Sequence, residues 1–275
     1  MRSTVPRLTS YSGKNAVITG ASSGIGRQLA LRIARAGARV ALVARREAAL
    51  RDLAGEIEQG GGQATVLPCD VAERAAVFAC AEQAIRAFGA VDILVNNAGY
   101  GHHRRFLEWE LDDMERMLRV NFFGALYWTK ALLPQMVERR TGWLVFMASV
   151  AGKLGVPEES AYAASKFAMV GLAEALSIEL EEVGVHVLTV CPGTIDTPFF
   201  DAEALARMPP VSRRMMIPPE RVVDAVFRAL AGGKHEITVP RLIAAGYVVR
   251  ALAPWLMRRS TKRTTIDAVA KRAKA

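Results

Sequence analysis

Residues 15–26 of the chain read NAVITGASSGIG: an apolar run, a glycine-rich turn and the start of a helical pattern. Glycine lets the chain turn tightly and lets a phosphate approach the backbone closely. The N-terminus of a helix adds free N–H donors and the positive end of the helix dipole. Because the spacing differs from the common G-x-G-x-x-G fingerprint, an ordinary glycine-rich turn is the alternative. The strand–turn–helix context favours nucleotide binding, by Gly20, Ser22, Ser23, Gly24, Ile25 and Gly26.

Apolar runs and helical patterns alternate along the rest of the chain. We expect strands at Asn15–Thr19, Arg39–Ala44, Gln63–Leu67, Val91–Val95, Gly142–Ala148, Val185–Val190 and Glu236–Val239. Helices are expected at Ile25–Ala36, Glu47–Gln59, Glu73–Phe88, about Asp112–Val137, Ala161–Glu182 and Pro219–Ala231. Continuous apolar strands separated by helices predict a parallel sheet that is covered on both faces. The predicted fold is therefore α/β: a doubly wound, Rossmann-like parallel sheet of seven strands with helices on both faces.

The chain has 275 residues and a net charge of +9 that is unevenly distributed. Residues 241–275 hold nine Lys/Arg and one acid, whereas residues 1–240 hold 27 basic and 26 acidic residues. We interpret residues 1–240 as one catalytic and nucleotide-binding domain, and residues 241–275 as an appendage that is first apolar and then basic. The first fourteen residues have no apolar core, so we expect no signal peptide and a cytoplasmic protein.

The three cysteines (Cys69, Cys80 and Cys191) are scattered and lack metal-ligand spacing. They predict buried free thiols in a reducing compartment. The adjacent His102 and His103 would point apart on a strand or helix, which indicates a polar loop. We therefore expect no metal site.

The end of the second predicted strand indicates which cofactor is preferred. A fold of this kind that binds NAD often places an acid there, for the 2′-hydroxyl of the ribose. This chain has Arg45 and Arg46 instead, and a guanidinium suits a phosphate by charge and by fork geometry. A hydroxyl from Ser22 or Ser23 would add a donor. The sequence thus predicts NADP(H) over NAD(H), although arginines that merely open the next helix are the alternative.

Tyr162 and Lys166 lie four residues apart in a predicted helix, so their side chains share one face. A cation beside a phenol favours the phenolate and lowers the pKa of the tyrosine. Such a phenol exchanges a proton near neutral pH more readily than an unperturbed one. This pair occurs by chance in many helices. Its position downstream of the glycine-rich turn and of Ser149 favours a catalytic role.

With these features the chain resembles the short-chain dehydrogenase/reductase family from Gly13 to about Pro240. The markers follow the family's order and include the turn Thr19–Gly26 and the stretch Asn96-Asn97-Ala98-Gly99. The resemblance implies a catalytic tetrad of Asn121, Ser149, Tyr162 and Lys166. It implies contacts to the cofactor from Asp70 at the adenine ring, and from Val71, Asn97, Ala98, Gly99, Tyr162, Lys166, Pro192, Gly193, Thr194, Ile195 and Thr197.

The resemblance also implies a role for each member of the tetrad. Tyr162 exchanges the proton of the substrate oxygen, and Lys166 stabilises the phenolate and binds the nicotinamide ribose. Ser149 polarises the carbonyl through a hydrogen bond. Asn121 holds a water that links the site to solvent as a proton relay. Hydride passes between the nicotinamide and the substrate carbon, which is the chemistry of the cofactor.

The segment after Thr197 is expected to cover the substrate. Phe199 and Phe200 begin it and methionines follow, which predicts an apolar and adaptable lid. Leu154, Val156 and Pro157 are expected to add apolar wall. We therefore expect a lipophilic ketone or alcohol as substrate. The arginine pairs 104–105 and 213–214 leave an anionic group open as an alternative.

The C-terminal segment has two interpretations. Leu242–Met257 is apolar except for Arg250, is interrupted by Pro254, and is followed by four basic residues up to position 263. It is a helix packed on the lid or on a partner subunit, or an interfacial helix on an anionic membrane. It is too short and interrupted to span a bilayer comfortably.

Two classes of function fit the pattern as a whole. The first is an NADP-dependent enzyme acting on CH–OH or C=O groups, and the second is a catalytically silent NADP-binding sensor or scaffold. The intact tetrad argues for the enzyme. A homodimer or homotetramer is implied by the resemblance, and we expect no nucleic-acid partner.

Overall fold

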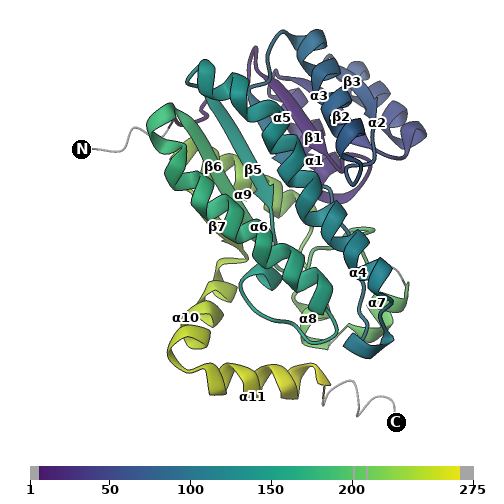
Figure 1. The fold of residues 1–275 in the computed structure, drawn as a ribbon, viewed down its shortest axis with the longest axis vertical. Coiled ribbons are helices and arrows are strands. Elements are labelled where there is room, and N and C mark those ends of the chain that lie inside the picture. The colour runs from purple at the N-terminus through teal and green to yellow at the C-terminus, as the bar shows by residue number, and fades with distance from the viewer. Residues whose placement is uncertain (1–5, 201, 209, 267–275) are drawn as a thin grey trace.

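The computed structural model describes residues 6–200, 202–208 and 210–266. Its centre is one parallel sheet of seven strands in the order β3-β2-β1-β4-β5-β6-β7 (Figure 1). The strands are β1 Asn15–Thr19, β2 Arg39–Ala44, β3 Gln63–Pro68, β4 Ile93–Asn96, β5 Gly142–Met147, β6 Val185–Pro192 and β7 Glu236–Val239. The predicted fold class is confirmed. The order reverses between β1 and β4, which is where a sheet of this kind binds its ligand.

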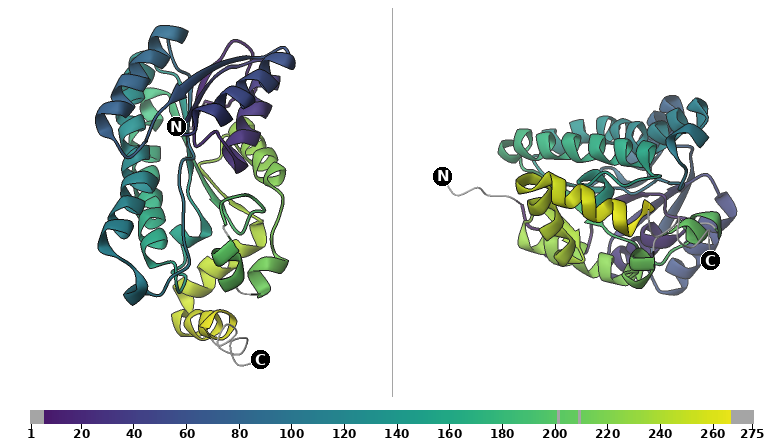
Figure 2. Two further views of the ribbon diagram at one scale, coloured as in Figure 1. Left: turned by 90° about the vertical axis from the view of Figure 1, so that its right-hand side faces the viewer. Right: turned by 90° about the horizontal axis from the view of Figure 1, so that it is seen from below.

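Helices cover both faces of the sheet, as Figure 2 shows in its left view. One layer contains α1 Gly24–Arg35, α2 Glu47–Gln59 and α9 Pro219–Gly232, and the other contains α3 Arg74–Phe88, α5 Gly124–Glu138 and α6 Ser160–Glu179. Successive side chains of β1 point to opposite faces of the sheet. Ile18 packs with α1 and α2, whereas Val17 packs with α3 and α5. Because both faces are covered, the inner strands read as continuous apolar runs, whereas the edge strands β3 and β7 are partly exposed.

The predicted helix Asp112–Val137 is interrupted. It consists of α4 Leu111–Leu118, a π-helical turn Arg119–Phe123, and α5. The wider turn brings the side chain of Asn121 into the interior, where it is fully buried. π-helical turns inside α-helices are rare and are frequently found at functional sites. The apolar periodicity could not reveal the interruption, because the helix continues on both sides of it.

The lid and the C-terminal segment form short helices that the sequence does not predict individually. The lid contains α7 Ala202–Arg207 and α8 Pro210–Arg214, and the C-terminal arm contains α10 Ala244–Leu252 and α11 Pro254–Thr264. Pro254 separates the two arm helices, because the residue before a proline is pushed out of the helical region and Ala253 has φ −141°. The arm lies at the lower end of the molecule, away from the sheet (Figure 1).

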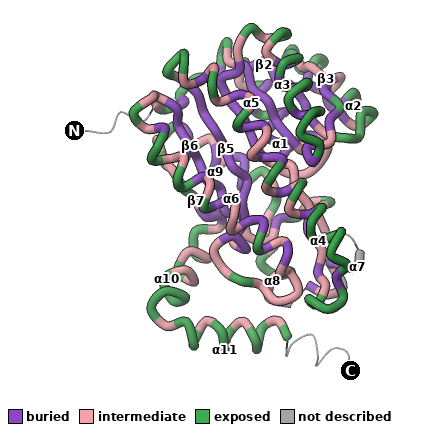
Figure 3. Tube along the Cα trace, in the orientation of Figure 1, coloured by how far each residue is buried: buried purple, intermediate pink, exposed green. Residues whose placement is uncertain are grey.

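The arm differs from the body in burial. No described residue of α10 or α11 is buried, and Figure 3 draws the whole arm as exposed or intermediate. Its contacts with the body include a bond of 3.3 Å from the Thr238 hydroxyl to Tyr247 Oη. Arg250 donates to the Lys153 carbonyl and lies over the Phe167 ring. Through its inner side the arm packs on the body, as one of its two interpretations expects.

Candidate active site

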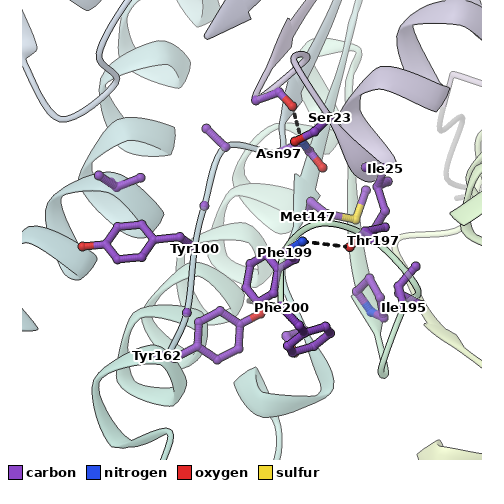
Figure 4. Close-up of a pocket in the computed structure, with 18 of the residues that line it drawn as sticks. Ser23, Ile25, Asn97, Tyr100, Met147, Tyr162, Ile195, Thr197, Phe199 and Phe200 are labelled. Carbon is purple, nitrogen blue, oxygen red and sulfur yellow. Dashed lines mark hydrogen bonds between the residues drawn. The ribbon is translucent and has the colours of Figure 1, made fainter. Parts of the chain in front are cut away.

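A cleft of about 590 Å³ opens along the carboxyl ends of the strands (Figure 4). At one end the glycine-rich turn joins β1 to α1. Gly20 and Gly24 have positive φ values of 66° and 56°. A Cβ on Gly20 would lie 2.8 Å from the Ala98 Cα atom, so glycine is required there. The turn thus leaves its backbone accessible at the N-terminus of a helix, which is the cradle that a pyrophosphate needs.

Gly26 has a different position from the other predicted turn residues. It does not line the cleft. A Cβ on it would lie 2.4 Å from both the Gly20 oxygen and Asn97 Nδ2. Gly26 therefore lets the turn pack against the end of β4, and its effect on a cofactor would be indirect.

Hydrogen bonds from Thr19 connect the turn to the end of β4. The Thr19 hydroxyl accepts the N–H groups of Asn97 and Ala98, at 2.9 and 3.0 Å, and donates to the Val95 carbonyl at 3.2 Å. Asn97 Nδ2 returns a bond to the Thr19 carbonyl at 3.0 Å. Sequence reasoning assigns no separate role to Thr19, and its place at the end of a buried strand is the only signal.

The outer end of the cleft carries the basic pair of the predicted NADP site. Arg45 and Arg46 are exposed and line the cleft, and Arg46 donates to the Ser22 hydroxyl at 3.0 Å. Asp70 accepts the Ala72 N–H at 3.0 Å and a bond from Arg116 at 2.9 Å. The guanidinium groups and the hydroxyl thus stand together at the end of β2.

Three of the four predicted catalytic residues line the cleft: Ser149, Tyr162 and Lys166. Ser149 follows β5, and its Oγ accepts the Ala151 N–H at 3.1 Å. Tyr162 and Lys166 come from the first turns of α6, as their spacing predicts. Lys166 Nζ donates to the Met147 carbonyl at 2.8 Å and lies 5.7 Å from the centroid of the Tyr162 ring.

Asn121 lies behind the wall of the cleft. Its Oδ1 accepts the Tyr100 N–H, and its Nδ2 donates to the Tyr100 carbonyl and to Ser165 Oγ, at 2.9, 2.9 and 3.1 Å. A Cβ on Gly99 would lie 3.1 Å from Asn121 Oδ1 and 3.5 Å from Lys166 Nζ. The glycine therefore provides the space between the amide and the ammonium group.

The electrostatics of Tyr162 differ from the sequence-based expectation. Burial raises the pKa of Tyr162, an interaction with the Ser149 hydroxyl lowers it, and the charge of Glu159 raises it further. Burial lowers the pKa of Lys166 to about 8. The expectation that the lysine lowers the pKa of the phenol is wrong for the protein alone. Desolvation dominates for both groups, and the ammonium lies by the ring and the Met147 carbonyl.

The substrate end of the cleft is mainly apolar. The Tyr162 ring meets Phe199 edge-on, with centroids 5.7 Å apart, and Phe199 meets Phe200 at 5.2 Å (Figure 4). The Phe199 N–H donates to Thr197 Oγ1 at 3.4 Å, which fixes the start of the lid. Val156 also lines the cleft. This part of the predicted apolar wall is in place.

A buried polar pair interrupts that apolar wall. His103 Nε2 lies 3.2 Å from Glu159 Oε1, and both residues line the cleft. Burial raises the pKa of Glu159 to about 7. Sequence reasoning treats His103 as part of a polar loop and does not single out Glu159. Their pairing could not be predicted, because it joins the loop after β4 to the start of α6.

The two arginine pairs, at 104–105 and 213–214, and Pro157 with Met208 do not line the cleft. Arg104 lies 3.7 Å from Asp113, and Arg105 lies 3.7 Å from Glu158, so they give no support to an anionic substrate group. Pro157 and Met208 border a second cavity of about 70 Å³, which the lid shares with Thr265 and Ile266 beyond α11.

The fold and the cleft define an oxidoreductase that uses a nicotinamide cofactor. The family described as short chain dehydrogenase matches residues 14–207. The chain belongs to this family of short-chain dehydrogenases/reductases.

Among curated proteins, a ketoacyl reductase of a Nostoc species is 32% identical, over 84% of this chain and 80% of the relative. A fatty acyl-CoA reductase of Acinetobacter baylyi is 35% identical, over 86% and 80%. Both relatives are reductases by name.

Solved structures agree with the fold. A short-chain dehydrogenase/reductase from Burkholderia phymatum in complex with NAD has a TM-score of 0.81 and 29% identity, covering 90% of this chain and 96% of its own. A metagenomic short-chain oxidoreductase in complex with NADP has a TM-score of 0.71 and 32% identity, covering 82% and 96%. Similar structures therefore hold either cofactor.

Proposed function

We propose that the protein transfers a hydride between NADP(H) and the carbon of a lipophilic ketone or secondary alcohol, with Tyr162 as general acid and base. One observation carries the proposal. Ser149, Tyr162 and Lys166 line a single cleft whose other end is a backbone cradle for a dinucleotide. Bound there, the nicotinamide supplies or accepts the hydride.

In this proposal the protein moves a proton and holds the reacting oxygen. The Tyr162 hydroxyl gives its proton to the substrate oxygen in reduction and takes it back in oxidation. The Ser149 hydroxyl donates to the same oxygen and stabilises the charge that develops on it. Lys166, whose pKa is about 8, exchanges its proton near neutral pH, and Asn121 lies behind it as the next member of a relay. Phe199 and Phe200 exclude water from this end.

The preference for NADP(H) is supported by the end of β2. Arg46 and Ser22 are already hydrogen-bonded to each other, and Arg45 is exposed beside them. These groups fit a 2′-phosphate by charge and by donor geometry. The cofactor contacts proposed from the resemblance all line the cleft except Gly26.

Turnover itself separates the enzyme from a silent NADP-binding sensor. We would measure NADPH consumption with steroid, aromatic and fatty-acyl ketones, using wild type and Tyr162→Phe. We expect turnover of at least one lipophilic ketone in wild type only. NADPH binding without turnover of any ketone or alcohol would favour the sensor.

Three finer statements belong to the same proposal. The protein is a homodimer or homotetramer, it works in the cytoplasm, and residues 241–275 form an appendage separate from the catalytic domain. Sedimentation measures the assembly directly. A monomer at micromolar concentration would contradict the first statement.

A further inference from the structure

Exposed apolar side chains run along the C-terminal arm, from the turn Arg241–Ile243 through both helices, and we call them the apolar stripe. Its exposed residues recur at helical spacing: Leu242, Ala245, Val248, Val249 and Leu252, followed by Trp255 and Leu256 of α11. Leu242 is 79% exposed, Leu252 81% and Trp255 65%. The inner face holds the contacts with the body, through Gly246 and Tyr247. Apolar residues on both faces of one short helix mean that the outer face lacks a partner within the described chain.

Basic residues continue this stripe along α11. Arg258, Arg259, Lys262 and Arg263 are all exposed and follow Trp255 and Leu256 at the same helical spacing. The sequence contains no acid between residues 241 and 266. We call the apolar stripe and these four basic residues the arm surface.

A second exposed apolar element lies at the same end of the molecule. The short helix Phe106–Glu108 exposes 63% of Phe106 and 95% of Leu107. Glu108 accepts a bond from Arg207 of α7 at 2.9 Å, which places this helix beside the lid. The lid helices α7 and α8 lie at the lower end of the molecule, as α10 and α11 do (Figure 1).

We propose that the arm surface docks on an anionic phospholipid membrane. Exposed apolar side chains, a tryptophan and neighbouring cations are the features by which a helix rests in the headgroup region. Each basic residue near an anionic surface adds about 1 kcal/mol of attraction. No described helix is both long and apolar enough to cross a bilayer, so the contact is peripheral.

Charge argues against a second copy of the chain as the occupant. A twofold contact would bring the same patch of two protomers together. The four basic residues of each arm would then face each other with no acid on the arm to compensate. Lipid phosphates instead complement these charges.

The end of the arm, just beyond the arm surface, borders the proposed substrate end of the cleft. Thr265 and Ile266 share a cavity with Met208 and Ser212 of the lid region, and with the pair His103–Glu159 of the cleft wall. Docking of the arm would therefore hold the lid at the membrane surface, where a lipophilic ketone or alcohol is concentrated. This step rests on the proposed function, whereas the docking does not.

Vesicle co-sedimentation of the full chain tests the docking. We expect binding to vesicles with about a third anionic lipid and little binding to purely zwitterionic ones, with release by high salt. Arg258→Glu with Arg259→Glu should weaken binding at least tenfold. The matched control, Arg35→Glu with Lys130→Glu, changes the net charge equally on exposed positions of α1 and α5. No binding at low salt, or equal loss in both double variants, would overturn the proposal.

Tryptophan fluorescence locates the contact. Trp109, Trp128 and Trp143 are buried, so Trp255 is the exposed one of the four tryptophans. Brominated lipid should quench part of the wild-type emission and none of that emission in Trp255→Phe. Trp255→Glu should weaken vesicle binding, whereas Ile178→Glu, at a 71% exposed position of α6, should not. If Trp255→Glu instead leaves vesicle binding intact and changes the sedimentation coefficient, the arm is a subunit contact and the proposal fails. A protein that docks but reduces no ketone retains the docking and loses only the proposed function.

Discussion

The two ends of the cleft are built in different ways. The nucleotide end consists of strand ends and tight turns, where backbone geometry fixes each position: Gly20 at φ 66°, and the Thr19 hydroxyl that holds two N–H groups of the next segment. The substrate end is assembled from side chains of distant segments, such as Phe199 on the lid and Glu159 at the start of α6. Backbone requirements leave a local sequence pattern, whereas side-chain packing between segments does not.

The largest effect is expected where the two ends meet. Tyr162→Phe removes the proposed proton donor and almost no volume, so kcat should fall about 10²–10⁴-fold. The affinity for NADPH should change little, because the nucleotide end is untouched. Steady-state kinetics and a fluorescence titration measure the two quantities. Tyr127→Phe, on α5 outside the cleft, is the matched control. Near-normal turnover in Tyr162→Phe would remove this residue from the mechanism.

The nucleotide end is tested by reversing its charge. Arg45→Asp, and separately Arg46→Asp, would place a like charge beside a 2′-phosphate and remove a charged hydrogen bond of about 1.5–3 kcal/mol. We expect the Kd for NADPH to rise at least about tenfold while that for NADH stays within a few fold. Arg35→Asp on α1 controls for net charge. Equal affinity of the wild type for both cofactors would contradict the assignment.

The sequence predicts the strands of the sheet closely, because burial restricts which residues a strand can contain. The five inner strands β2, β1, β4, β5 and β6 are largely buried and must be apolar on both faces, so they are visible as apolar runs. Strands β1, β2 and β7 have the predicted bounds. Of the predicted cofactor and catalytic residues, only Gly26 and Asn121 do not line the cleft. Both lie behind its wall, Gly26 in close packing against the end of β4 and Asn121 in a π-helical turn. A residue pattern cannot distinguish lining the cleft from supporting it.

The sequence predicts the pKa shifts of the site residues less well than it predicts their positions. The four-residue spacing of Tyr162 and Lys166 correctly predicts a shared face, yet it says nothing about how deeply they are buried. Burial decides the direction of both pKa shifts. The depth of Tyr162 depends on Phe199 and on the loop around Gly101, which lie far from it in the sequence. For the same reason the pair His103–Glu159 could be found only in the structure.

The substrate end is tested through the pH dependence of the reaction. Burial raises the pKa of Glu159 to about 7, so above neutral pH it becomes a carboxylate that opposes the Tyr162 phenolate. Glu159→Gln removes that charge while keeping a polar partner for His103. The alkaline rise of alcohol oxidation should therefore move to lower pH, by up to about one unit. Glu158→Gln, next to it but paired with Arg105, should leave the profile in place. An unchanged profile in Glu159→Gln would show that the pair only stabilises the fold.

The smallest effect is expected for Lys166, whose buried ammonium group lowers the free energy of unfolding. Burial lowers the pKa of Lys166 from 10.5 to about 8. Below pH 8 the folded protein holds a buried charge, and between about 8 and 10.5 it releases a proton that the unfolded chain keeps. The contribution of Lys166 to stability therefore rises with pH in that window. A pKa shift of this size means that the buried charge destabilises the folded protein by about 3 kcal/mol at neutral pH. The Met147 carbonyl loses its donor when the lysine is replaced, which costs about 1–3 kcal/mol.

In Lys166→Met, removal of the buried charge stabilises the protein and loss of the hydrogen bond to the Met147 carbonyl destabilises it. The variant should therefore melt only about 2–4 °C above wild type at pH 7, and we expect it to lose activity. The gap should narrow at pH 10, because the wild type then folds with a neutral amine. Thermal unfolding of both proteins across pH 7–10 measures this. Lys130→Met, at an exposed position of α5, should show no such trend. A lower melting temperature for Lys166→Met at every pH would mean that the bond to Met147 outweighs the buried charge. The buried lysine would then be a net stabiliser of the fold.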